Sequence, residues 1–313
     1  MQETVTLTIN PSIDTSIQVA QVIAGRKLRG ESPRHEPGGG GINVSRALRR
    51  LGGQSTLMYT AGGSYGELLR MLLDEEELNH FPISIRGLTR ENFVVREASS
   101  EQQYRFTVPG PHLEEKEWMH FLARLSTLHP CPKYIVISGS LPEGVPADFY
   151  TRAAHLGHEL GALVIVDTSG KALQLAAESG VYLLKPNLHE LRQMSGKPLE
   201  DEAEQEKAVM ELVHSRRSEN VVLSLGAAGV LLGDSHGCTR VRAPVVPVKS
   251  KVGAGDSMVA GIVYALAQDM PLHEAIQYGV AAGAAAVMTP GTELCRKEDT
   301  EQLYERLRQE QEA

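Results

Sequence analysis

The sequence predicts an α/β fold in which a doubly wound, mostly parallel sheet is covered by helices on both faces. Short β-branched or apolar runs, bounded by turn residues, alternate with longer segments of helical periodicity. Strands and helices that alternate in this way imply right-handed crossovers and a parallel sheet. The chain has 313 residues, of which 42% are hydrophobic and 22% charged, so it can bury a large core.

The expected elements cover most of the chain. Two regions, about 16–35 and 89–108, carry period-2 segments without a helix between them, and we expect them to form a separate small β-sheet lid. Residues 1–313 are therefore expected to form a single domain with a discontinuous lid. We expect strands at 5–9, 56–60, 134–138, 163–167, 181–185 and 221–225, and helices at 42–51, 65–73, 115–128, 147–160, 201–214 and 254–267.

Charge and hydropathy exclude several classes of partner. The formal net charge is −8, so no general basic face is available for nucleic acid. No apolar run reaches the roughly 18–20 residues that a membrane span needs. The N-terminal residues lack the basic segment of a secretory signal, and we expect a cytoplasmic protein. An anionic substrate would need a local basic cluster.

The segment 249–258 carries the clearest chemical signal. Gly253, Ala254 and Gly255 lead into a predicted helix, so backbone N–H groups at its N-terminus can converge on an oxyanion. Asp256 then lies in the first turn, where its carboxylate can accept a proton from an attacking hydroxyl group. The spacing fits a second interpretation equally well, in which Asp256 only caps the helix.

Four consecutive glycines at 38–41 precede another predicted helix. Ordering such a tract costs backbone entropy, which favours a position that something must approach closely. A flexible linker is the alternative, although structured apolar segments flank the tract on both sides. Asn43 lies one turn into the helix and is suited to binding polyol hydroxyl groups or to a solvent-exposed position.

Two further segments follow predicted strands. Asn187 and Glu190 can present oxygen ligands to a hydrated Mg²⁺, or they can form a capping box at the start of a helix. The glycine turn at 224–229 can pass under a nucleotide or simply close a hairpin.

Basic residues occur in both excursions of the lid. Lys27 and Arg29 are two residues apart and are expected to share a strand face, and Arg90 and Arg105 bracket the second excursion. In an acidic chain such a cluster would attract a phosphate group, for which arginine offers bidentate geometry. Ordinary solvated charges at a sheet edge are the alternative.

Taken together and in this order, four motifs resemble the PfkB family of ribokinase-like carbohydrate kinases over nearly the whole chain. They are the glycine tract with Asn43 (38–43), Lys-Pro-Asn-x-x-Glu (185–190), Ser-Leu-Gly (224–226) and Gly-Ala-Gly-Asp (253–256). Within the family, the segments at 8–14, 27–29, 103–106 and 137–142 are most similar to 6-phosphofructokinases of the isozyme-II type.

The resemblance implies an ATP-dependent kinase that phosphorylates the O1 hydroxyl of fructose 6-phosphate, with Mg²⁺ and with a homodimer formed through the lid. Asp256 matches the catalytic base, and Gly253, Ala254 and Gly255 match the anion hole. The remaining matches imply that sugar phosphate binds to Asp14, Lys27, Arg29, Gly39, Gly40, Asn43, Arg90, Arg105 and Ser138, ATP to Lys185, Asn187, Ser224, Gly226 and Gly229, and Mg²⁺ to Asn187 and Glu190.

The resemblance also leaves alternatives. Fructose-1-phosphate and tagatose-6-phosphate kinases of the family commonly carry Lys at the third position of the glycine tract, so the all-glycine tract at 38–41 favours fructose 6-phosphate. A sugar-phosphate sensor without catalysis is less favoured, because it has no need of Asp256. The family places nucleotide-ring and K⁺ contacts along 289–293, where Pro290 and Glu293 depart from its pattern.

Overall fold

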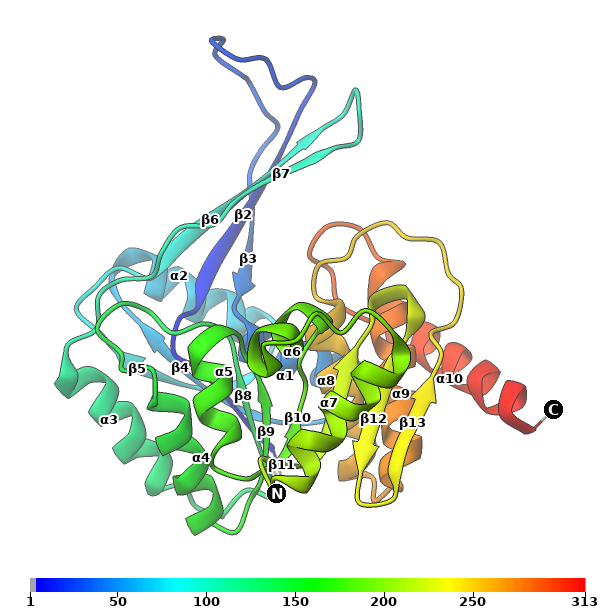
Figure 1. The fold of residues 1–313 in the computed structure, drawn as a ribbon. Coiled ribbons are helices and arrows are strands. Elements are labelled where there is room, and N and C mark those ends of the chain that lie inside the picture. The colour runs from blue at the N-terminus through cyan, green and yellow to red at the C-terminus, as the bar shows by residue number, and fades with distance from the viewer. Residues whose placement is uncertain (1–3, 313) are drawn as a thin grey trace.

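A nine-stranded sheet forms the centre of the protein, and the computed structural model describes it together with the rest of residues 4–312 (Figure 1). The strands from β11 to β5 run parallel, whereas β12 and β13 are antiparallel at one edge. In spatial order they are β13 (Gly237–Val241), β12 (Val230–Asp234), β11 (Ser218–Ser224), β10 (Val181–Leu184), β9 (Leu163–Asp167), β8 (Tyr134–Ser138), β1 (Thr4–Thr8), β4 (Thr56–Ala61) and β5 (Asn79–Ser84).

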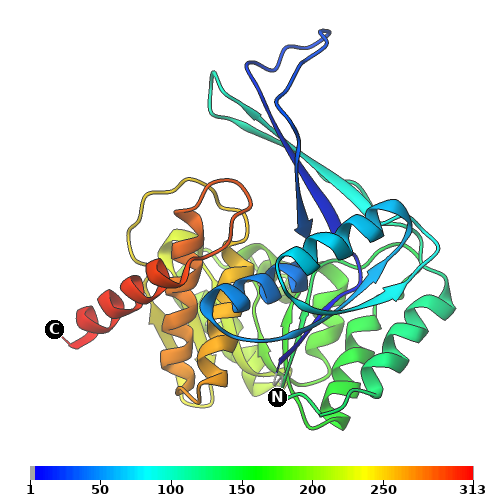
Figure 2. The ribbon, with the colours of Figure 1, turned by 180° about the vertical axis from the view of Figure 1, so that it is seen from behind.

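Helices cover both faces of this sheet, as Figures 1 and 2 show from opposite sides. One face carries α3 (Glu115–Ser126), α4 (Phe149–Glu159), α5 (Gly170–Ala177), α6 (Leu188–Ser195) and α7 (Glu202–His214). The other face carries α1 (Gly40–Leu51), α8 (Ala254–Ala267), α9 (Leu272–Val287) and α10 (Lys297–Glu312), with α2 (Gly63–Glu75) beside them. The predicted doubly wound, mostly parallel α/β fold is confirmed.

Strand β8 shows why the sheet is buried on both faces. Ile135 and Ile137 belong to the hydrophobic cluster under α3 and α4, whereas Tyr134 and Val136 belong to the cluster under α1 and α8. Successive side chains of a strand point to opposite faces of the sheet, so both sets of side chains must be apolar when helices cover both faces.

Within residues 4–312, no helix combines the length and the hydropathy that crossing a membrane requires.

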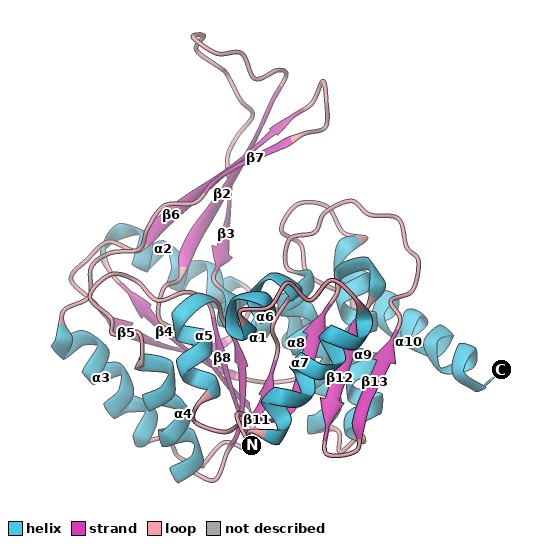
Figure 3. Ribbon diagram, in the orientation of Figure 1, coloured by secondary structure: helices cyan, strands magenta, loops and turns pink. Residues whose placement is uncertain are grey.

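A separate four-stranded sheet forms the lid (Figure 3). Its order is β3 (Arg34–Gly38), β2 (Ser12–Val19), β6 (Arg90–Glu97) and β7 (Gln103–Phe106). The lid contains two antiparallel hairpins, β2–β3 and β6–β7. The far ends of both hairpins project away from the nine-stranded sheet, and the loop between β2 and β3 forms one of these ends. Lys27 and Arg29 lie in that loop, so the expectation that they share a strand face is wrong.

Two arginines on α1 anchor this helix to the end of α2 in contrasting environments. Arg46 is 2% exposed and donates hydrogen bonds from Nε to both carboxylate oxygens of Glu76, at 2.9 and 2.8 Å. Arg49 lies three residues later, pairs with Glu77, and has a side chain that is 44% exposed. The two ion pairs therefore differ mainly in their access to water.

We expect Arg46→Ala to lower the free energy of unfolding by about 3 kcal/mol, because it removes one partner of a largely buried ion pair. Arg49→Ala is the matched control and should cost less than about 1 kcal/mol, since exposed pairs contribute little. Urea denaturation of both variants measures the difference. Equal losses would show that burial does not decide the strength of these pairs.

Candidate active site

The carboxyl ends of adjacent parallel strands place several of the predicted site residues together. Ser138 ends β8, Lys185 follows β10, and Ser224 ends β11. Asp167 ends the intervening strand β9 and was given no role in the sequence analysis. Ligands of open α/β sheets bind at the carboxyl ends of the strands. A polar residue at the end of an apolar strand is therefore the sequence signal that indicates Asp167.

Asp256 lies in the first turn of α8, beside backbone N–H groups that have no partner within the helix. The N-cap residue before this helix is Gly253, whose φ of 74° is in the left-handed region. The N-cap residue is Gly253, and Asp256 is the third residue of the helix, so Asp256 is not the residue that caps it. Instead, Asn43 Nδ2 donates a hydrogen bond of 2.9 Å to Asp256 Oδ2.

The Asp256 carboxyl group keeps part of its surface exposed, yet protein surrounds most of it. Burial raises its pKa to about 7, and the negative charge of Asp167 adds to this effect. The hydrogen bond from Asn43 and the charge of Lys185 act in the opposite direction. A carboxyl group with a pKa near neutrality can both accept and release a proton at physiological pH.

Lys185 supplies positive charge beside the same turn. Its side chain is buried, and its Nζ atom lies 3.0 Å from Asp167 Oδ1. Burial by itself would lower the pKa of Lys185, but the carboxylates of Asp167, Glu190 and Asp256 outweigh burial and raise it. A Cβ atom at Gly255 would lie 3.7 Å from this Nζ atom, which places the ammonium group next to the N-terminus of α8.

The glycine tract packs tightly, so the linker interpretation is wrong. Gly39 has a φ of 121°, a value that residues with a Cβ atom rarely adopt. A Cβ atom on Gly40 would lie 2.1 Å from Ser138 Oγ, and one on Gly38 would lie 2.6 Å from Asp14. The tract therefore brings its backbone directly against Ser138 and Asp14.

The base of the lid holds Asp14 and Arg90 beside the tract. Asp14 Oδ1 accepts hydrogen bonds from Ser12 Oγ at 2.8 Å and from Asn92 Nδ2 at 2.9 Å. Arg90 donates to the carbonyl oxygens of Asn10 and Val108, at 3.1 and 3.0 Å. Burial lowers the pKa of Arg90, against the opposing charge of Asp14. Asn92 is a further site residue that the sequence analysis did not identify.

The other three basic residues lie apart from this group. Lys27 and Arg29 are exposed on the projecting loop, and Arg105 is exposed on β7. Of the four basic residues of the predicted phosphate cluster, Arg90 alone is at the base of the lid. Of these four residues, Arg90 is thus the one that lies beside Asp14 and the glycine tract.

A cavity of about 430 Å³ opens on the opposite side of the α8 N-terminus. Ser224, Gly226 and Gly229 line it, as do small residues of α9 such as Gly283. The 224–229 segment is a hairpin turn between β11 and β12, which confirms the hairpin interpretation. It also forms a wall of this cavity, and its contact with a nucleotide stays a prediction. The volume is in the range typical of small-molecule sites, and most of the lining is apolar.

Asn187 and Glu190 form the capping box of α6. Asn187 Oδ1 accepts from the Glu190 N–H group at 2.9 Å, and Glu190 Oε2 accepts from the Asn187 N–H group at 2.8 Å. Burial raises the pKa of Glu190. Within residues 4–312 no group of three or more His, Cys, Asp or Glu side chains is arranged to hold a metal ion by itself. The oxygen donors here fit Mg²⁺, which keeps several waters and needs few protein ligands.

Comparison with known proteins agrees with this geometry. A family model described as pfkB family carbohydrate kinase matches residues 7–299. The ATP-dependent 6-phosphofructokinase isozyme 2 of Mycobacterium tuberculosis is 43% identical over 301 residues, covering 96% of this chain and 88% of that protein. The Escherichia coli isozyme 2 is 40% identical over 300 residues, covering 96% and 97%. The 1-phosphofructokinase of Bacillus subtilis is 32% identical over 298 residues, covering 95% and 96%.

Solved structures show the same similarity. Phosphofructokinase-2 from E. coli in complex with potassium has a TM-score of 0.95 and 40% identity, covering 98% of this chain and 100% of that one. The same protein in complex with fructose-6-phosphate and in its tetrameric inhibited form gives TM-scores of 0.92 and 0.93, each at 39% identity and with coverage of 98% and 100%. Ribokinase from Arabidopsis thaliana, at 18% identity over 97% of this chain and 99% of that one, shares the fold with a TM-score of 0.77. The family resemblance of the four motifs is thereby confirmed, and the chain belongs to the pfkB family of carbohydrate kinases.

Proposed function

We propose that the protein is an ATP-dependent 6-phosphofructokinase, which transfers the γ-phosphoryl group of ATP to the O1 hydroxyl of fructose 6-phosphate. The observation that carries this proposal is the position of Asp256. Its carboxyl group lies beside free N–H groups of α8, between the apolar cavity and the glycine tract, and its pKa is raised to about 7. The relatives named for this activity are 40–43% identical over nearly the whole chain.

The donor binds on the cavity side. The turn at 224–229 and α9 enclose the base and ribose, in a cavity whose lining is mostly apolar. Lys185 neutralises phosphate charge at the α8 N-terminus, and the N–H groups of Gly253, Ala254 and Gly255 bind the oxygens of the transferred phosphoryl group. Asn187 is assigned to the same ligand because it follows Lys185 at the start of α6.

The acceptor binds on the lid side. The tract packs against Ser138 and Asp14, and Asn43 in the helix that follows it is hydrogen-bonded to Asp256. We assign the sugar hydroxyl groups to Asp14, Gly39, Gly40, Asn43 and Ser138. The 6-phosphate requires cations, and we assign it to the basic residues of the lid. Arg90 at the base of the lid lies beside the other acceptor residues. Lys27, Arg29 and Arg105 project away from them, and their part in phosphate binding stays a prediction.

Asp256 then performs the proton transfer. Its carboxylate accepts the O1 proton as O1 attacks the γ-phosphorus atom, and the bond to the β,γ-bridging oxygen breaks so that ADP leaves. The free N–H groups at 253–255 stabilise the charge on the equatorial oxygens. Asn43 holds the carboxylate in place through its hydrogen bond of 2.9 Å.

Mg²⁺, when bound, neutralises charge that develops between the β- and γ-phosphates. Asn187 and Glu190 would hold it, directly or through water. The K⁺ contact along 289–293 stays a prediction. In that segment the carbonyl oxygen of Gly291 accepts a hydrogen bond of 2.6 Å from Ser250, which links the segment to the start of α8.

The lid also provides the expected dimer interface. The lid exposes Leu28, Phe93, Phe106 and Val108 to solvent, and such apolar side chains favour association. We propose that two copies pack through these lids, while residues 1–313 of each form one domain. A cytoplasmic location stays a prediction from the sequence.

Two alternatives are less favoured. Phosphorylation of fructose 1-phosphate or tagatose 6-phosphate would agree with the family, but the 1-phosphofructokinase relative is only 32% identical, and the tract at 38–41 is all glycine. A sugar-phosphate sensor would not need a partly buried carboxyl group hydrogen-bonded beside an anion-binding helix terminus.

We expect ADP release with fructose 6-phosphate and MgATP, measured in a coupled assay against equal concentrations of fructose 1-phosphate and tagatose 6-phosphate. The value of kcat/KM should be highest for fructose 6-phosphate, because the tract at 38–41 is all glycine and lacks the lysine that kinases of the other two substrates commonly carry. Faster turnover of either competitor would reassign the substrate, and binding without any phosphorylated product would support the sensor.

The pH dependence of kcat/KM should show an acid limb near pH 7. Because the pKa of Asp256 is raised to about 7, this carboxyl group is protonated below that pH and cannot accept the O1 proton. Activity should therefore rise with pH up to about 7 and then level off. The pKa values of fructose 6-phosphate and ATP are measured separately, so that the ionisation of the substrates is allowed for in the profile.

Asp256→Asn is the control for this profile. It should lower kcat by roughly 10²–10⁴-fold, the range typical for loss of a general base, and the acid limb should disappear. An acid limb below pH 5 in the unmodified protein, or a variant that retains most of its activity, would exclude Asp256 as the base.

A further inference from the structure

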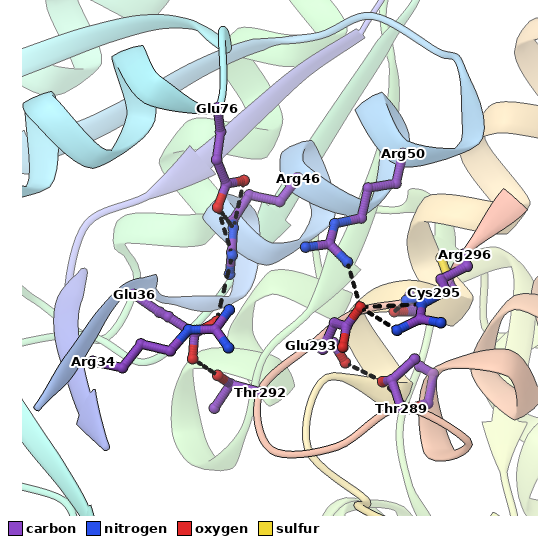
Figure 4. Close-up of polar contacts among 12 residues, drawn as sticks. Arg34, Glu36, Arg46, Arg50, Glu76, Thr289, Thr292, Glu293, Cys295 and Arg296 are labelled. Atoms are coloured by element: carbon purple, nitrogen blue, oxygen red, sulfur yellow. Dashed lines mark hydrogen bonds and ion pairs between the residues drawn. The ribbon is translucent and has the colours of Figure 1, made fainter. Parts of the chain in front are cut away.

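A polar network joins the lid strand β3 to the loop before α10 (Figure 4). The Glu36 side chain on β3 is buried, and one of its carboxylate oxygens accepts a hydrogen bond from the Thr292 hydroxyl group. Its other oxygen lies 3.1 Å from Arg34 and 3.9 Å from the buried Arg46. A buried carboxylate is costly unless its partners stay in place, so this contact constrains both segments.

The loop at 288–296, which we call the support loop, lies behind the anion-binding turn. Ser250 Oγ donates a hydrogen bond of 2.6 Å to the carbonyl oxygen of Gly291. A Cβ atom on Gly253 would lie 2.6 Å from the buried side chain of Leu294, so the turn rests directly on the support loop. A displacement of this loop would therefore move the N–H groups at the start of α8.

The other end of the network belongs to the acceptor side. Glu36 is separated by one residue, Pro37, from the glycine tract that packs against Ser138 and Asp14. Arg46 binds this same backbone, because its Nη1 atom donates a hydrogen bond of 3.2 Å to the Pro37 carbonyl oxygen. The contact between Glu36 and Thr292 thus joins the segment that leads into the glycine tract to the support loop behind the anion-binding turn.

We propose that Glu36 and Thr292 are positioning residues for phosphoryl transfer, whose hydrogen bond holds the glycine tract in register with the anion-binding turn. The inference rests on the proposed function, since it assigns the acceptor to the tract and the transferred group to the turn. Neither side chain has to touch a substrate. Each substrate binds its own side of the cleft, so loss of the link affects alignment more than binding. Misplacement of reacting groups by 1 Å can cost about 10²-fold in rate.

Thr292→Val tests the proposal, because it replaces the hydroxyl group with a methyl group of similar size. We expect kcat to fall about tenfold, as for misalignment by a fraction of an ångström, while KM for each substrate stays within about twofold. Thr292→Ser keeps the hydroxyl group and should restore kcat. Arg34→Gln is the matched control on the same carboxylate: its side chain is 69% exposed, and the substitution should leave kcat unchanged.

Hydrogen exchange of the amides at 250–257 provides a readout that does not depend on the substrate. These amides should exchange faster in Thr292→Val than in the unmodified protein or in Thr292→Ser. The proposal is overturned if Thr292→Val keeps its kcat, if its loss appears only in KM, or if serine does not restore it. If the unmodified protein does not turn over fructose 6-phosphate, the proposed function is overturned. If hydrogen exchange at 250–257 is unchanged in Thr292→Val, the positioning role is overturned separately.

Discussion

The hydrogen bond from Asn43 to Asp256 joins residues that are 213 positions apart in the chain, and the rest of the site is arranged around it. It forms because α1 and α8 pack against each other on one face of the sheet. The N-cap residue of each helix is a glycine with positive φ, Gly39 before α1 and Gly253 before α8. These glycines let the two backbones turn sharply into their helices, so that Asn43 and Asp256 come within hydrogen-bonding distance.

The charges around this bond explain why the cleft is suited to phosphate chemistry. Asp167, Glu190 and Asp256 all raise the pKa of Lys185, which stays charged although it is buried. Burial raises the pKa of Asp256 toward neutrality, and the negative charges of Asp167 and Asp14 add to this effect. A phosphoryl group and a divalent cation entering together would bring charges of both signs, which the free N–H groups, Lys185 and the carboxylates can each balance.

Local sequence patterns predicted the fold, but they did not predict the contacts between segments that are distant in the chain. Strands such as 134–138 are apolar at every position because helices cover both faces, and this is visible in the sequence. Helix α9 was not predicted, because its alanines and glycines are buried nearly all round and show no amphipathic period. The motifs located Asp256 and the glycine tract, whereas Asn92, Asp167 and the contact between Glu36 and Thr292 depend on how distant segments pack.

The central claim is that one carboxyl group lies between the acceptor hydroxyl and the anion-binding turn. A crystal structure with fructose 6-phosphate and a non-hydrolysable ATP analogue tests it most directly. The account predicts that O1 of the sugar lies within hydrogen-bonding distance of Asp256 and in line with a terminal phosphate bound to the N–H groups at 253–255. A sugar bound with O1 pointing away from Asp256, or a terminal phosphate bound away from that turn, would contradict it.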